Sequence, residues 1–190
     1  ASASAAVAEA RTSIAQPAGD IALPTPTASP DPYAALPALQ RVVYPLLAID
    51  SRVVPVGVTA AGLMDTPDFA VGHIDQSAQP GLTGNVVLAA HNDIAGALFR
   101  RLTESELGDT VVLYRGATAF TYEVQFQTKV WEQGAPRRER EANARFLLPT
   151  RNPICTLITC MPLWVDTHRW IVRAVLRDVR ALPSRRSTEA

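Results

Sequence analysis

The residues best suited to covalent chemistry are a cysteine and an arginine that stand at the ends of two predicted strands. Cys160 closes a β-branched and aliphatic run that begins at Ile154, and Pro162 cannot continue a strand ladder. Cys160 therefore falls on the last residue of its strand, at a rim. Arg169 opens the next β-type run, which continues to Leu176, so the thiol and the guanidinium can face each other across one loop.

A histidine completes the set. His91 ends the run from Val86 to Ala90, which is continuously apolar, as is typical of a strand buried on both faces. A thiol attacks as the thiolate, which a neighbouring imidazolium stabilises before it protonates a departing amine. Arginine supplies a permanent charge and a fork of donors for a developing oxyanion. These residue types predict acyl transfer through Cys160, with His91 as acid and base and Arg169 at the oxyanion.

Other residues compete for these roles. His168 adjoins Arg169, but neighbouring residues on a strand point to opposite faces. Arg173 shares a face with Arg169 but lies about 13 Å further along the strand at the usual rise. Asp93 could orient the histidine, although a helix cap is its simpler role. The first three residues therefore remain the preferred set.

The two cysteines, Cys155 and Cys160, lie five residues apart on one extended run. At roughly 3.3 Å per residue their Cα atoms would be about 16 Å apart, whereas a disulfide allows about 7 Å. We therefore expect two free thiols. Cys155 shares its side of the strand with Leu157, which indicates core packing.

Composition excludes several classes of function. The formal net charge is +0 with both signs intermixed, which provides no footprint for nucleic acid. The thiols and imidazoles lack zinc-site spacing, and the acidic residues do not cluster as in a calcium loop. We expect no nucleic-acid partner, no metal and no cofactor. No run approaches the roughly 20 apolar residues of a membrane span, and no signal-peptide pattern opens the chain, so we expect this stretch to be soluble.

The chain divides by composition into three parts. Residues 1–40 are rich in Ala, Ser, Thr and Pro, which predicts a disordered stalk or linker. Residues 41–179 have the β-type texture of a folded domain, and residues 180–190 form a polar tail. The domain would carry all of the chemistry.

Short β-type runs separated by turns favour a mainly β fold, a small closed or nearly closed barrel. The predicted strands include 46–49, 53–58, 110–115 and an alternating run from Phe120 to Val130. Asp50-Ser51 reads as a turn, and Pro55 marks an edge or bulged strand. Helical spacing from Ile94 to Leu102 predicts a short helix after His91, and the mixed charges of 137–141 predict a solvated loop.

Thr156 to Cys160, Thr-Leu-Ile-Thr-Cys, resembles the Thr-Leu-x-Thr-Cys signature of sortases, transpeptidases of the Gram-positive type of cell surface. The interval from Cys160 to Arg169 is also similar to theirs. Val71-Gly72-His73 and the segment from Gly84 to His91 resemble the block that ends in the family's catalytic histidine. The likeness covers roughly residues 41 to 178 in three ordered motifs, which together are more specific than any one alone.

The resemblance implies an eight-stranded sortase-type β-barrel with short helices on its connections. It implies catalytic roles for His91, Cys160 and Arg169, substrate contacts from Thr159 and Arg169, and supporting roles for His73 and Asn92. The enzyme would cleave a C-terminal sorting signal in secreted proteins through a thioacyl intermediate on Cys160. The acceptor would be an amine on a peptidoglycan precursor or a pilin subunit. The protein would work outside the cytoplasm at the cell surface, held to the membrane by a segment beyond this sequence.

Two other functions fit the same residues. A thiol peptidase would use the same groups with water as the acceptor, and product analysis with an added amine separates the two reactions. A non-catalytic cell-surface β-barrel binding module would keep Cys160 and His91 as core residues with ordinary reactivity.

Overall fold

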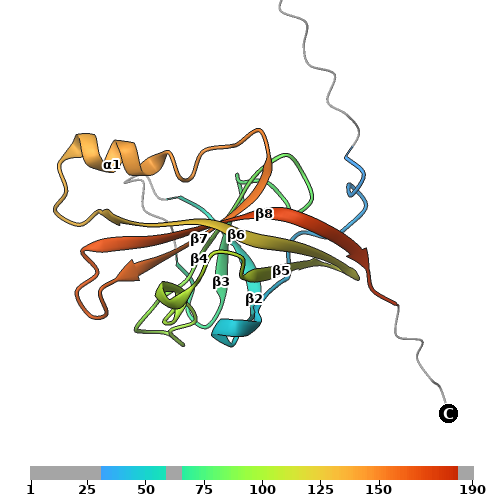
Figure 1. Ribbon diagram of the computed structural model, residues 1–190, viewed down its shortest axis with the longest axis horizontal. Helices are drawn as coiled ribbons and strands as arrows, with labels where there is room; N and C mark the ends of the chain where they lie inside the picture. The colour runs from blue at the N-terminus through green and yellow to red at the C-terminus, as the bar shows by residue number, and fades with distance from the viewer. Residues whose placement is uncertain (1–30, 59–65, 184–190) are drawn as a thin grey trace, which may run out of the picture. The chain divides into compact units, whose positions relative to one another are not determined.

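The computed structural model describes residues 31–58 and 66–183, in which eight strands close into one barrel (Figure 1). The strands follow the order β1-β2-β3-β4-β7-β8-β6-β5 around the barrel. Their bounds are β1 Arg41–Tyr44, β2 Ile49–Val56, β3 Val71–Ile74, β4 Gly84–Ala89, β5 Thr110–Arg115, β6 Thr118–Trp131, β7 Pro153–Met161 and β8 His168–Ala181. The predicted mainly β, eight-stranded barrel is confirmed.

The described helical elements are short and lie on connections between strands. They are the helix α1 (Arg137–Ala144) and two 3-10 turns, η1 (Pro45–Leu47) and η2 (Leu102–Glu104). Figure 1 shows α1, in orange, on the connection between β6 and β7. Among the described helices, none is long and apolar enough to cross a bilayer.

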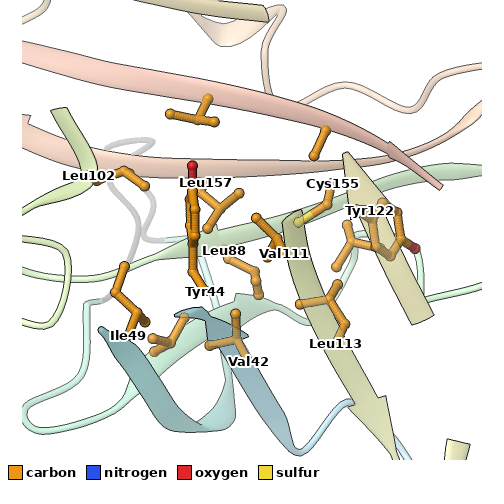
Figure 2. Close-up of a cluster of buried hydrophobic side chains, with 14 of the residues drawn as sticks. Val42, Tyr44, Ile49, Leu88, Leu102, Val111, Leu113, Tyr122, Cys155 and Leu157 are labelled. Atoms are coloured by element: carbon orange, nitrogen blue, oxygen red, sulfur yellow. The ribbon is translucent and has the colours of Figure 1, made fainter. Parts of the chain in front are cut away.

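The core contains the inward-facing side chains of the barrel. Phe120, Tyr122 and Val124 of β6 are buried, as the alternation predicted, but Phe126 is exposed because the strand register shifts between Val124 and Phe126. Figure 2 shows the core in close-up, including Tyr44, Val42, Leu88, Val111, Leu113, Cys155 and Leu157. Cys155 is fully buried there and, like Cys160, is a free thiol, as predicted.

The predicted strand 46–49 and the turn at Asp50-Ser51 are wrong. β1 and β2 form a hairpin in which Tyr44 pairs with Ile49, and η1 fills its loop. Pro45 suits the first position of that turn because it needs no N–H donor there. β2 pairs with β1 only as far as Arg52, so Pro55 lies where β2 has one neighbour, β3, as an edge proline should.

The predicted helix after Asp93 is absent and is replaced by turns that end in η2. Ala95 and Ala97 have positive φ angles of 49° and 47°, and the carbonyl of Ala95 accepts the backbone N–H of Phe69 instead of an intrahelical donor. The apolar spacing does not mark one buried face, since Leu102 and Phe99 are fully buried but Ile94 is 53% exposed. Tertiary packing, rather than helix propensity, therefore sets this segment.

The predicted loop at 137–141 is also wrong, because this run forms most of α1. Arg137 and Glu141 form a salt bridge at i, i+4 spacing, and Pro136 precedes the first turn, both of which favour a helix. The expected solvation is right, since α1 has no buried residue.

The end of the predicted linker packs on the barrel. Arg115 is only 4% exposed, and its guanidinium donates hydrogen bonds to the carbonyls of Tyr33, Leu36, Pro37 and Pro80. The linker therefore reaches the barrel before residue 41. The rest of the predicted linker, residues 1–30, lies outside the described residues. Residues 184–190 of the predicted tail lie outside them as well, and the first two residues of that tail belong to β8, which ends at Ala181.

Candidate active site

Three neighbouring strands, β4, β7 and β8, bring the predicted residues to one rim. β4 and β7 are parallel, with Ala89 opposite Ile158, so the same register continued by two residues sets His91 beside Cys160. On the other side of β7, Cys160 pairs directly with Arg169 of the antiparallel strand β8. The three residues thus reach the same rim, His91 from the segment that follows β4 and the other two from paired strand positions. β7 ends at Met161, one residue beyond the predicted last position.

His91, Cys160 and Arg169 also line one cavity of about 610 Å³. Ile158, Ile171 and Phe146 make part of its wall apolar. Charged residues of α1, together with Glu132 directly after β6, also line it: Arg137, Arg140 and Glu141. The cavity therefore has both apolar and charged walls beside Cys160.

Two side chains fasten the histidine-bearing segment to the cysteine-bearing strand. The Thr159 hydroxyl donates to the Ala90 carbonyl at 2.8 Å, and Asn92 Nδ2 donates to the Cys160 carbonyl at 2.8 Å. Both side chains are 3% exposed. These buried hydrogen bonds hold His91 and Cys160 at fixed positions, because neither partner can turn to water without losing its bond.

His91 is half-buried, and its Nε2 lies 3.2 Å from the Thr66 carbonyl oxygen. A carbonyl only accepts, so Nε2 must carry a proton to make this bond. In the neutral ring Nδ1 then holds the lone pair and is the nitrogen that can take a proton.

The Arg169 guanidinium is held by the chain that precedes it. Its Nη1 donates to the Asp166 carbonyl at 2.8 Å and to the His168 carbonyl at 3.1 Å. Among the described residues its Nε and Nη2 have no hydrogen-bond partner, so these donors are available to an oxyanion.

Burial raises the pKa of the Cys160 thiol, and this outweighs the opposing effect of the Arg169 charge. The carboxylates of Asp166 and Asp93 raise the pKa of the thiol further. Since a free cysteine is already mostly protonated at neutral pH, Cys160 is a thiol there. A base must remove its proton before it can attack, and His91 is the base that shares its cavity.

The competing residues lie elsewhere. His73 is buried, with Nε2 bonded to the Ala78 carbonyl and the Ser77 hydroxyl, and burial lowers its pKa. His168 Nδ1 is bonded to the Thr167 hydroxyl. Arg173 stacks over the Phe146 ring at 4.9 Å. His73, His168 and Arg173 are not among the residues that line the described cavity.

Asp93 is neither a helix cap nor attached to His91. Its carboxylate accepts the backbone N–H of Trp164 at 3.0 Å, which ties the segment after β4 to the β7–β8 loop. The carboxylate therefore positions two loops beside the rim.

Sequence reasoning missed the contribution of α1 to the cavity. The charge run was treated as solvated loop, although the i, i+4 pair Arg137–Glu141 after Pro136 was a visible helix signal. The local sequence does not show how that helix is oriented relative to the barrel. Its orientation places Arg137, Arg140 and Glu141 on the cavity wall.

A family model and several solved structures are similar to this chain. The model of the sortase domain family matches residues 43–177. Sortase A from Corynebacterium diphtheriae, a lid mutant, is 26% identical with a TM-score of 0.61, covering 78% of this chain and 75% of that one. Sortase A of Listeria monocytogenes is 20% identical with a TM-score of 0.62, covering 77% and 92%. Sortase C-1 of Actinomyces oris is 24% identical with a TM-score of 0.59, covering 73% and 71%.

No curated protein sequence matches the chain. The family model nevertheless spans most of the barrel, including all three rim residues, and solved sortases share its fold. This chain therefore belongs to the sortase family.

Proposed function

We propose that this protein is a cysteine transpeptidase that cleaves a C-terminal sorting signal in secreted proteins and transfers the acyl part to an amine. The acceptor amine belongs to a peptidoglycan precursor or a pilin subunit, and the enzyme works outside the cytoplasm at the cell surface, anchored to the membrane. One observation carries the proposal: Cys160 and Arg169 are paired across β7 and β8, His91 follows the end of β4 beside them, and all three residues line one cavity.

The first half of the reaction forms a thioester. His91 Nδ1 takes the proton of the Cys160 thiol, and Sγ attacks the scissile carbonyl carbon. Arg169 donates to the oxygen on which negative charge develops. When the tetrahedral intermediate collapses, the C–N bond breaks and the imidazolium gives its proton to the departing amine. The acyl group remains on sulfur.

The second half returns the free enzyme. An incoming amine attacks the thioester carbonyl carbon while His91 takes the proton that the amine loses. The C–S bond then breaks, an amide forms, and the proton returns to Cys160. Thr159 and Asn92 support both halves by holding β7 to the end of β4. Thr159 also lines the cavity and, with Arg169, contacts the substrate. His73 supports the β3–β4 connection at a distance from the cavity.

The test is direct detection of the thioacyl enzyme. The protein is incubated with peptides that contain candidate sorting signals, and the intact protein mass is measured after acid quench. We expect an acyl adduct in the wild type and in Cys155→Ala, and no adduct in Cys160→Ala, since Cys155 is 0% exposed. An adduct retained in Cys160→Ala refutes the assignment.

Product analysis distinguishes an amine acceptor from water. With glycinamide added, the amine should attack the thioester, so that the acyl group leaves Cys160 as an amide in place of the acid. If only the acid forms at any amine concentration, the protein is a thiol peptidase that uses water.

A further inference from the structure

The segment from Phe146 to Leu148, between α1 and β7, forms one wall of the catalytic cavity without belonging to the sheet. Phe146 and Leu147 line the cavity. The backbone N–H groups of all three residues bond to carbonyls of the turn before them, from Asn143 to Arg145. Within the described part of the chain, no backbone hydrogen bond ties this wall to a strand. Side chains must therefore set where it lies.

A buried amide on β4 holds the wall. Asn85 is 2% exposed, and its Nδ2 donates to the Phe146 carbonyl at 2.9 Å and to the Leu148 carbonyl at 3.2 Å. Because a carbonyl only accepts, this end of the amide must be the NH₂ group. The Phe146 carbonyl also accepts Nη2 of Arg173 at 3.2 Å, but the Leu148 carbonyl has no second donor in residues 31–58 and 66–183.

A buried hydroxyl on β7 fixes the amide in turn. Thr156 is 0% exposed, and its Oγ1 donates to Oδ1 of Asn85 at 2.7 Å. The amide is thus bonded at both ends, and it cannot rotate without losing those bonds in a site closed to water. Thr156 therefore acts on the wall through Asn85.

Neither side chain of this pair lines the cavity. Thr156 lies four residues before Cys160 on β7, on the same face of the strand and about 13 Å away at the usual rise. Ile158, which lies between them on that face, does line the cavity. The pair is too far from the sulfur to take part in the chemistry, but it can set how far the wall stands from Ile158.

Resting on the transpeptidase function above, we propose that Asn85 and Thr156 are positioning residues for the sorting signal. By holding the wall segment, they keep Phe146 and Leu147 at the separation from Ile158 at which an apolar side chain of the peptide fits between them. If the amide bonds are lost, the Leu148 carbonyl can turn to water, because Leu148 is 57% exposed. The wall then loosens while the barrel stays folded.

The hold on the wall is tested without any substrate. Hydrogen exchange of the Leu147 and Leu148 amides is measured by NMR in the wild type, Thr156→Val and Thr156→Ser. Valine keeps the shape of threonine but lacks the hydroxyl, so the turn should open more often and both amides should exchange about fivefold faster. Serine keeps the hydroxyl and should restore the wild-type rates. Wild-type exchange rates in Thr156→Val overturn the proposal.

Positioning is tested with two reagents for Cys160 that need no known sorting signal. In N-acetyl-leucyl-alanyl chloromethyl ketone the thiolate displaces chloride from the CH₂ carbon, and the leucine side chain uses the wall. Iodoacetamide is too small to use it. The ratio of the two second-order rate constants should fall about fivefold in Thr156→Val, stay at the wild-type value in Thr156→Ser, and fall at least tenfold in Asn85→Ala. An unchanged ratio in Thr156→Val overturns the proposal, even if both rates fall.

A double variant tests whether the hydroxyl acts through the amide. Adding Thr156→Val to Asn85→Ala should change the ratio by less than about twofold, because the amide that the hydroxyl orients is already gone. A further fivefold fall overturns the proposal.

Ser105→Ala is the matched control. It also removes a buried hydroxyl that donates to an amide oxygen, Oε1 of Gln127 at 2.9 Å, and Ser105 does not line the cavity. This variant should keep both the reagent ratio and the exchange rates of the wild type. A wild type that neither reagent labels contradicts the transpeptidase function itself, and the exchange experiment still decides whether the pair holds the wall.

Discussion

Replacing Arg169 by glutamine should make Cys160 less reactive at neutral pH. The two residues are directly paired across β7 and β8. The guanidinium lowers the pKa of this thiol, whereas burial and the carboxylates of Asp166 and Asp93 raise it. Glutamine keeps much of the side-chain length but removes the charge. The pKa of Cys160 should therefore rise further, and the thiolate fraction at pH 7 should fall.

The size of the effect follows from the pairing. Directly opposite residues have Cβ atoms about 5 Å apart, which brings the two charges to about 6 Å. At that distance one charge pair is worth roughly 0.7 to 2.8 kcal/mol for effective dielectric constants between about 80 and 20. The thiolate fraction then falls by roughly threefold to a hundredfold. A more basic thiolate is also more nucleophilic, and this offsets about half of the logarithmic loss in reactivity. The alkylation rate at pH 7 should therefore fall roughly twofold to tenfold.

The assay is alkylation by iodoacetamide, followed by intact mass from pH 6 to pH 10. Cys155 contributes no background because it is fully buried and burial raises its pKa as well. The matched control is Arg173→Gln, which removes a charge from the same strand at a residue paired with Thr156 and stacked on Phe146. This control should alkylate at the wild-type rate.

The outcome that refutes the reasoning is an Arg169→Gln protein whose alkylation curve coincides with the wild type or moves to lower pH. Either result would mean that the guanidinium does not stabilise the thiolate. Arg169→Lys separates charge from geometry: it should keep the alkylation curve but lose most thioacylation, because an ammonium lacks the planar fork of donors.

Two further predictions concern charge and stability. Asp93→Asn and Asp166→Asn each remove a carboxylate that raises the pKa of Cys160, so iodoacetamide should alkylate each variant roughly two- to threefold faster at pH 7; unchanged rates would contradict the electrostatic account. Arg115→Met removes a buried guanidinium that is bonded to four carbonyls and should lower stability by about 3 kcal/mol, a drop in Tm of roughly 9 °C by calorimetry. Arg41→Met, which removes an exposed pair with Asp50 and a cation–π contact with Tyr114, should change Tm by less than about 2 °C. Equal effects of the two variants would contradict the role of Arg115.

The part of the site that could be predicted from the sequence is the part made by neighbouring strands. β7 and β8 are consecutive and antiparallel, so their shared loop places Cys160 opposite Arg169 once the two runs are recognised. Pro162 and the β-branched residues before it were sufficient signals. The same holds for Phe120 to Val124, where alternation alone separated core from solvent.

The errors occur where tertiary contacts override local propensity. Ile94 to Leu102 has helical spacing, yet Leu102 is buried in the barrel core and the backbone before it bends through Ala95 and Ala97 with positive φ. At 46–49 an apolar run forms the loop of a hairpin, because Pro45 begins a turn there and Leu47 is buried under it. In both segments only some of the apolar residues are buried: Leu47 and Leu102 are in the core, whereas Leu46 and Ile94 are exposed. Apolar spacing alone therefore does not distinguish a strand or a helix from a turn at these positions.

The position of His91 beside Cys160 depends on a contact that no local pattern encodes. β4 and β7 are separated in the chain by β5, β6 and α1, yet they pair in parallel from Gly84 opposite Pro153 to Ala89 opposite Ile158. A slip of one residue in this register would turn Cys160 to the face opposite His91, because side chains alternate along a strand. Buried bonds from Thr159 and Asn92 oppose such a slip at the reactive end. The catalytic pairing therefore depends on register, and these two polar side chains connect the stability of the barrel to its chemistry.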